Sequence, residues 1–187
     1  MKIFQAFRVL RCIIDDPLTL INSRFSEKHF TRNRKMPFCD VLRFFFDMKK
    51  TTLQTRLNDF FKGTSKNMSE QAFSKARNLF DHSPFETMVR ELVKEEYSNP
   101  NHLPKWNGYH LLAVDGSYLQ LPKNQKLKEA FGTRGNDDCV SAGISVLYDL
   151  LTGWAIDPAI THSDMNERKE CDKHIDYLSR ELPHRRS

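Results

Sequence analysis

The most informative stretch of this chain reads Leu111-Leu112-Ala113-Val114-Asp115-Gly116-Ser117. Four consecutive apolar residues are typical of a strand that is buried on both faces. A carboxylate follows them directly, beside a glycine, and this pattern predicts that the strand ends there and opens into a loop. We therefore expect Asp115 at the rim of a site, held rigidly by the end of a strand. A plain surface turn after a strand is the simpler alternative.

The sequence that follows predicts an antiparallel hairpin. Residues 140–148 carry an apolar side chain or Ala at every even position, residues 149–153 have turn composition, and residues 154–160 alternate again. Alternation with a period of two indicates strands rather than helices. The expected strands are 110–121, 139–149 and 154–161.

A helix is expected after the hairpin, from about 166 to 182, packed on the sheet. Its apolar stripe consists of Cys171, Ile175, Leu178 and Leu182, which we expect to face inward. Glu170 and His174 are four residues apart, a spacing that puts side chains on one helix face, so a metal site is one interpretation. Because the stripe is expected to point inward, the pattern favours a solvated face for both residues.

The order of strand, hairpin and helix resembles the opening of a ribonuclease H-like domain. In detail, the motifs are similar to those of insertion-sequence transposases of the DDE type, in their family-four branch. The motifs that carry this resemblance are Ala113-Val114-Asp115-Gly116-Ser117, Leu121-Pro122, Phe131-Gly132, Tyr148-Asp149, Thr152-Gly153 and Asn166-Glu167. Each motif is short, and together they cover about residues 35 to 182.

The resemblance implies a function in DNA transposition. Such a transposase binds transposon-end DNA and cuts and joins strands with Mg²⁺ or Mn²⁺ held by three carboxylates. It implies that Asp115 is the first catalytic, metal-binding acid. The second acid normally follows the next strand, in an Asp-Arg-Gly-Tyr-like motif, and the third is a Glu further on; neither motif occurs in these 187 residues. We therefore expect an N-terminal portion, truncated before the second acid and inactive by itself.

The acids nearest to Asp115 in the sequence do not fit the missing roles. They are expected in a loop, a turn and a hairpin strand: Asp137, Asp138, Asp149 and Asp157. None follows the helix that precedes the second acid of the family. One carboxylate holds Mg²⁺ weakly, so Asp115 alone is not expected to position two ions.

Positive charge is concentrated in the first half of the chain. Residues 1–100 contain 18 Lys and Arg against 12 Asp and Glu, a net charge of +6, whereas residues 101–187 contain 11 against 12, a net charge of −1. Such a division is expected where one part meets phosphates. Residues 22–36 are basic with interleaved Phe25 and Phe30, which suits either an arm on a DNA backbone or a solvated linker.

The first half of the chain has the periodicity of several short helices. We expect a first helix at 3–14, with Phe4, Phe7, Leu10 and Ile14 on one face, and further helices between 38 and 97. The expected starts are Phe38, with that helix ending near Lys49, Thr51 with Gln54 as a capping box, Ser69, and Ser83 followed by Pro84.

The helix that begins near Ser69 is the best candidate for DNA contact. Phe73, Ala76 and Phe80 are expected to face inward, which leaves polar and basic side chains outside: Gln71, Ser74, Lys75, Arg77 and Asn78. Such side chains donate to base edges and phosphates, as in a helix-turn-helix. A polar surface helix is the alternative. The run 71–77 also resembles the N-terminal region of the transposase family, which favours DNA.

Together these patterns predict an α+β chain, in which an N-terminal helical, helix-turn-helix-like region precedes the start of a ribonuclease H-like domain. The expected parts are 1–36, an N-terminal helix and basic arm; 37–99, a helical DNA-binding region; and 100–187, an incomplete catalytic domain. Expected partners are double-stranded transposon-end DNA and a second copy or an intact transposase, but no membrane. Four scattered cysteines fit a reducing cytoplasm. A non-catalytic DNA-binding regulator and a helical interaction protein remain as alternatives.

Overall fold

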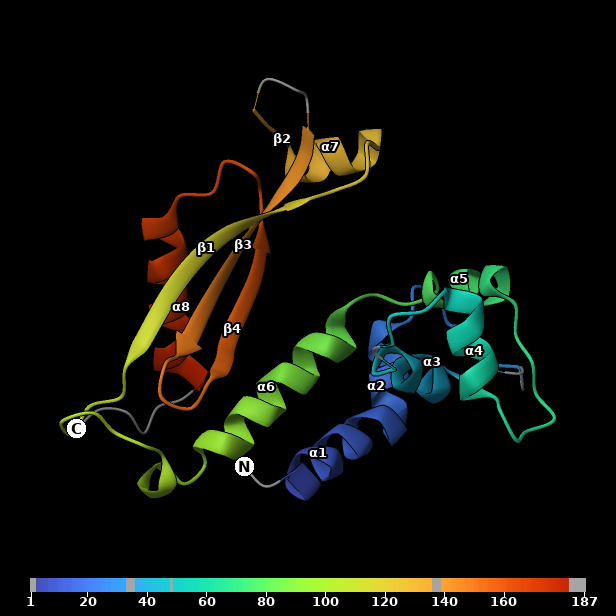
Figure 1. The fold of residues 1–187 in the computed structure, drawn as a ribbon, viewed down its shortest axis with the longest axis horizontal. Coiled ribbons are helices and arrows are strands. Elements are labelled where there is room, and N and C mark those ends of the chain that lie inside the picture. The colour runs from blue at the N-terminus through green and yellow to red at the C-terminus, as the bar shows by residue number, and fades with distance from the viewer. Residues whose placement is uncertain (1–2, 33–35, 48, 136–138, 182–187) are drawn as a thin grey trace. The chain divides into compact units, whose positions relative to one another are not determined.

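The computed structural model describes residues 3–32, 36–47, 49–135 and 139–181. Within these ranges the fold is mixed α+β, with eight α-helices and four strands in antiparallel pairs (Figure 1), which confirms the expected fold class at this coarse level. The chain divides into two compact units, residues 1–88 and 89–187. The three-part division expected from the sequence stays a prediction. In the described ranges no helix has the length and apolar character needed to cross a membrane.

The first unit is helical. Its elements are α1 (Ile3–Asp15), α2 (Pro17–Ser23), α3 (Phe38–Phe45), α4 (Leu53–Phe60), α5 (Glu70–Arg77) and the beginning of α6 (Ser83–Tyr97). Val41 and Leu42 are fully buried at the centre. Phe44 and Phe73 meet edge to face, with ring centroids 4.7 Å apart, a geometry that adds to the stability from burial.

Helix α2 was not expected from the sequence. Asp16 and Pro17 end α1 as predicted, but they also start a new helix: Asp16 Oδ1 accepts the N–H of Leu18 at 3.0 Å, and Pro17 occupies the first helical position. Helix α3 ends at Phe45, four residues before the expected Lys49.

The packed face of α1 also differs from the expected one. Leu10 and Ile14 contact the core as predicted, but Phe4 and Phe7 are exposed, with 85% and 63% of their surface in solvent. Only the C-terminal half of α1 therefore contributes to the core, and a periodic apolar pattern cannot show where the neighbouring helices stop.

Side-chain caps mark the starts of α4 and α5. Thr52, and not the expected Thr51, caps α4, since its Oγ1 accepts the N–H of Thr55 at 3.3 Å. Ser69 caps α5 as predicted. Gln54 is therefore not the partner of a capping box, and its amide is used elsewhere.

Residues 24–32 are partly tied to the helical core. The ring of Phe30 meets the rings of Phe38 and Phe80 at centroid distances of 5.4 and 6.1 Å, and His29 Nδ1 lies 3.0 Å from the carbonyl oxygen of Leu79. Phe25 is 65% exposed. Residues 33–35 of the predicted basic segment lie outside the described residues.

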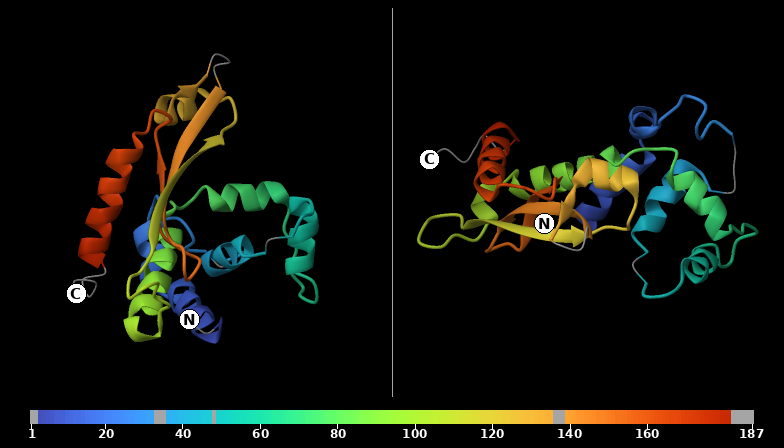
Figure 2. Two further views of the ribbon diagram at one scale, coloured as in Figure 1. Left: turned by 60° about the vertical axis from the view of Figure 1, so that its left-hand side comes forward. Right: turned by 90° about the horizontal axis from the view of Figure 1, so that it is seen from above.

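The second unit is built on the sheet. After the end of α6 it contains η1 (Pro100–His102), β1 (Leu112–Gln120), α7 (Gln125–Phe131), β2 (Thr133–Arg134), β3 (Cys139–Asp149), β4 (Trp154–Thr161) and α8 (Glu167–Glu181). Strand β3 is central and pairs antiparallel with β1, β2 and β4. The three long strands and the following helix match the predicted positions, whereas the short β2 was not predicted. Helix α8 lies along one face of the sheet (Figure 2).

Candidate functional site

Asp115 lies in the middle of β1 and not at its end. The strand continues to Gln120, and Asp115 is paired with Val146 of β3. Its side chain is exposed, and its Oδ1 accepts the N–H of Gly116 at 2.9 Å. The expectation that the strand ends at Asp115 is wrong, whereas the expected strand 110–121, which contains Asp115, is confirmed. Strand β3 is long enough to pair with every residue of β1, and the Asp-Gly pair is not a turn here.

Gly116 is required by packing. A Cβ at this position would lie 2.8 Å from Met165 Cε and 3.3 Å from Glu167 Oε1, and a Cβ on Gly143 of β3 would lie 2.8 Å from Met165 Sδ. The two glycines therefore let the segment before α8 lie directly on the sheet. Side chains alternate along a strand, so the Glu167 carboxylate approaches β1 on the face opposite to Asp115.

The described residues do not fit a two-metal site at Asp115. Two-metal phosphoryl transfer needs several carboxylates around ions about 4 Å apart. The parts of the chain that the structure describes contain no group of three or more His, Cys, Asp or Glu suited to hold a metal ion. Asp137 and Asp138 lie outside those parts. Among the described residues, the candidate metal site at Asp115 thus has a single exposed carboxylate, that of Asp115 itself.

Only part of the expected inward stripe of α8 faces the sheet. Leu178 packs against the core of the second unit as predicted, and Cys171 is half-buried. Ile175 is 53% exposed, whereas Glu170 and His174, which were expected on a solvated face, are 6% and 1% exposed. His174 is buried because two strands of the sheet provide hydrogen-bond partners for its ring. Its Nδ1 lies 2.7 Å from Asp157 Oδ2 of β4, and its Nε2 lies 2.9 Å from the hydroxyl of Ser145 in β3. Leu182 lies outside the described residues.

Ser145, His174 and Asp157 have the contact order of a serine-hydrolase triad. A catalytic serine must meet a carbonyl carbon of its substrate, but Ser145 is only 2% exposed. The imidazole instead satisfies a buried hydroxyl and a half-buried carboxylate, as buried polar groups require. The triad order therefore fixes α8 to β3 and β4 and gives no nucleophile at the surface.

Asp149 is a structural carboxylate at the β3–β4 turn. It is fully buried and accepts hydrogen bonds from Tyr97 Oη at 2.6 Å and from the N–H groups of Leu151 and Thr152 at 2.9 and 3.2 Å. Burial raises the pKa of Asp149, but these hydrogen bonds lower it by more, so the carboxyl pKa lies below its ordinary value.

Helix α5 presents four of its five candidate DNA-binding residues to solvent. Gln71, Lys75, Arg77 and Asn78 are exposed, and Ser74 is half-buried. Phe73 and Phe80 are buried as predicted. Residues 61–69 connect α4 to α5, and this connection is longer than the three or four residues usual in a helix-turn-helix. The finer helix-turn-helix assignment therefore stays a proposal.

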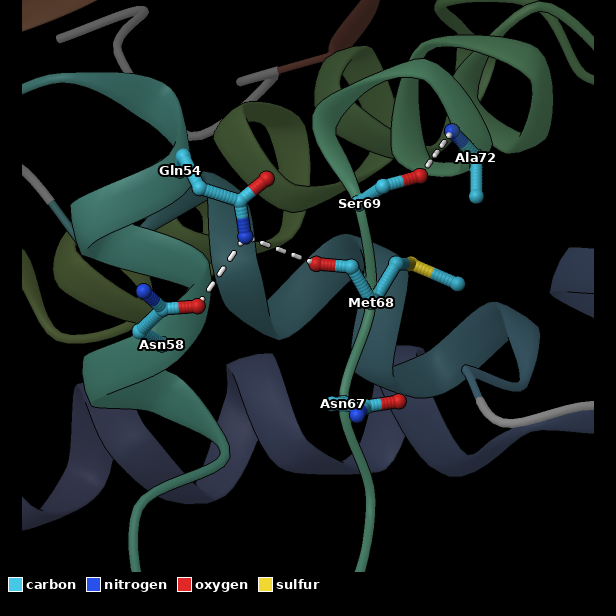
Figure 3. Close-up of a pocket in the computed structure, with 6 residues that line it drawn as sticks. All are labelled: Gln54, Asn58, Asn67, Met68, Ser69 and Ala72. Atoms are coloured by element: carbon cyan, nitrogen blue, oxygen red, sulfur yellow. Dashed lines mark hydrogen bonds between the residues drawn. The ribbon is translucent and has the colours of Figure 1, made fainter.

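A pocket of about 570 Å³ lies beside the start of α5 (Figure 3). Its lining comes from α4, from the connection after it and from the first turn of α5: Gln54, Asn58, Asn67, Met68, Ser69 and Ala72. Sequence reasoning missed this site. The only signal was the i, i+4 spacing of Gln54 and Asn58, which is common on solvated helices.

Comparison of the chain with protein-family models, with curated proteins and with solved structures found no match.

Proposed function

We propose that this chain is a DNA-binding protein of the DDE-transposase type, which contacts duplex DNA through the helical unit and carries Asp115 as the first acid of a transposition site. The observation that carries the proposal is the exposed polar and basic face of α5. Residues 1–88 contain 16 Lys and Arg against 9 Asp and Glu, a net charge of +7, which supports attraction to phosphates. The antiparallel order β1-β3-β4 followed by α8 is the order that the family resemblance implies.

Duplex binding and its salt dependence test the first part of this proposal. The affinity should fall steeply between 50 and about 200 mM salt, because each neutralised phosphate releases condensed counterions. Lys75→Ala with Arg77→Ala should weaken binding about tenfold and reduce the slope of log K against log salt by about two. Fluorescence anisotropy with a labelled duplex measures both quantities.

A matched control removes charge elsewhere. Lys169→Ala with Arg180→Ala takes two exposed cations from α8, in the second unit, and should leave the affinity nearly unchanged. Equal affinity of wild type and the α5 variant would exclude α5 from the interface, and no binding at low salt would remove the proposal.

The catalytic part of the proposal predicts inactivity of the purified chain. With Mg²⁺ or Mn²⁺ it should not nick supercoiled DNA, because Asp115 is one carboxylate and two-metal chemistry needs more. Gel analysis of plasmid nicking, beside Asp115→Ala as the matched variant, checks this. Metal-dependent nicking that disappears in Asp115→Ala would contradict the prediction and would mean that a second copy or other residues complete the site.

Two alternative functions differ from this proposal in class. A non-catalytic DNA-binding regulator is favoured by the single exposed carboxylate at Asp115, and DNA binding without nicking agrees with it. A helical interaction protein is favoured by the exposed apolar side chains of α1 and α2, which include Phe4, Phe7 and Leu18. Absence of DNA binding in the titration would favour this second alternative.

A further inference from the structure

The pocket beside α5 has a neutral, carboxamide-rich wall. Three of its six lining residues are Asn or Gln, and none is charged. Met68 and Ala72 add apolar surface. Such a lining suits a flat, uncharged group that carries donors and acceptors on its edge, and it does not suit a phosphate or a hard cation, which prefer charged partners.

Gln54 fixes the geometry of this pocket. Its Nε2 donates to Asn58 Oδ1 and to the carbonyl oxygen of Met68, both at 3.0 Å (Figure 3), and its Oε1 accepts the N–H of Glu70 at 3.1 Å. One amide thus joins α4, the connection and the first turn of α5. The orientation of the Asn58 carboxamide is set in advance, as a binding group requires.

Asn58 retains capacity for a ligand. Its Oδ1 accepts one hydrogen bond from Gln54, and a carbonyl oxygen has two lone pairs. Its Nδ2 has no acceptor among the described residues. The exposed Asn58 side chain therefore offers a donor and an acceptor side by side, which match N7 and the N6 amino group of adenine in the major groove.

We infer that this pocket recognises the edge of an adenine in duplex DNA, with Asn58 as the specificity-determining residue and Gln54 as a positioning residue. The inference rests on the proposed DNA binding. Asn58 lies in the last turn of α4, and the pocket that it lines also includes Ser69 and Ala72 at the start of α5, so it is placed beside the exposed face of α5 that carries the proposed DNA contact. Lys75 and Arg77 lie in the last turn of α5, where they contact phosphates.

Selection from a randomised duplex library tests this assignment. The wild-type chain should enrich a motif with at least one position that prefers adenine. Asn58→Ala should reduce the preference at that position about tenfold, with an unchanged salt dependence, because no phosphate contact is lost. Asn101→Ala, which removes an exposed asparagine of the second unit, should leave the motif unchanged. Circular dichroism checks that each variant is folded.

A second variant changes the chemistry of the group and keeps its size. Asn58→Asp replaces the donor by an acceptor, so the preference for adenine should be lost and cytosine, whose N4 amino group donates, should gain. Wild-type binding without base preference, or the same motif for wild type and Asn58→Ala, would overturn the inference and leave DNA binding intact. Failure of the wild type to bind any duplex would overturn both.

Discussion

Asp149→Ala is expected to lower the free energy of unfolding of the second unit by about 3 kcal/mol, since hydrogen bonds to a buried charged group each contribute about 1.5 to 3 kcal/mol. The substitution leaves the hydroxyl of Tyr97 and the N–H groups of Leu151 and Thr152 without their acceptor. Tyr97 is 7% exposed, so water does not readily replace the carboxylate.

Urea denaturation followed by tryptophan fluorescence measures this effect. The two tryptophans, Trp106 and Trp154, both lie in the second unit, so their emission reports on that unit. Asp172→Ala removes an exposed carboxylate of α8 and should change the unfolding free energy by less than about 0.5 kcal/mol. Equal midpoints for Asp149→Ala and Asp172→Ala would show that the turn does not depend on Asp149.

The stabilisation by Asp149 depends on pH with a defined sign. The folded-state pKa lies below the ordinary value of 3.8, so the carboxylate contributes its full stabilisation above that value. The contribution is lost as the pH falls through the folded-state pKa, because the native hydrogen bonds require the charged form. Asp149→Asn should therefore show a weaker loss of stability below about pH 4 than the wild type does.

The strands were predictable from the sequence because two signals agreed. The period-two pattern on both sides of Asp149–Gly153 located β3 and β4, and the turn residues fixed their ends. The expected strand 110–121 contains Asp115, but the interpretation of Asp115 as a strand end conflicted with it. Gly116 was interpreted as the start of a loop, whereas the structure needs a glycine for the close approach of Met165, a tertiary contact that local pattern does not contain.

The inward face of α8 was predicted only in part, for a related reason: Leu178 packs inward as expected, but Ile175 is exposed and His174 is buried. Hydropathy predicts that Cys171 and Ile175 are buried. It contains no information about the two hydrogen bonds that Ser145 and Asp157 form with His174. A buried polar group is tolerated only where partners exist, and those partners come from two other elements. The carboxamide pocket was not predicted because its lining residues also come from separate elements. Gln54 and Asn67 are brought together by the path of residues 61–69.

His174→Leu is expected to destabilise the second unit by about 2 to 4 kcal/mol, because it leaves a buried hydroxyl and a half-buried carboxylate without their partner. The side chain is 1% exposed. Its Nδ1 donates to Asp157, which as a carboxylate accepts only, and its Nε2 shares a hydrogen bond with the hydroxyl of Ser145. Leucine fills a similar volume, so the loss reflects the polar contacts more than a cavity.

His162→Leu is the matched control, because it also removes a histidine that contacts an aspartate, Asp164, but on an exposed side chain. Its effect should stay below about 1 kcal/mol. Ser145→Ala combined with His174→Leu forms a double-mutant cycle, and a coupling of about 1 kcal/mol or more is expected for groups in contact.

The same proteins distinguish a structural role of these residues from a catalytic one. A serine-directed fluorophosphonate should not label the folded wild type, since Ser145 is buried. Labelling that disappears in His174→Leu, with little change in stability, would show instead that Ser145, His174 and Asp157 act as a nucleophilic site.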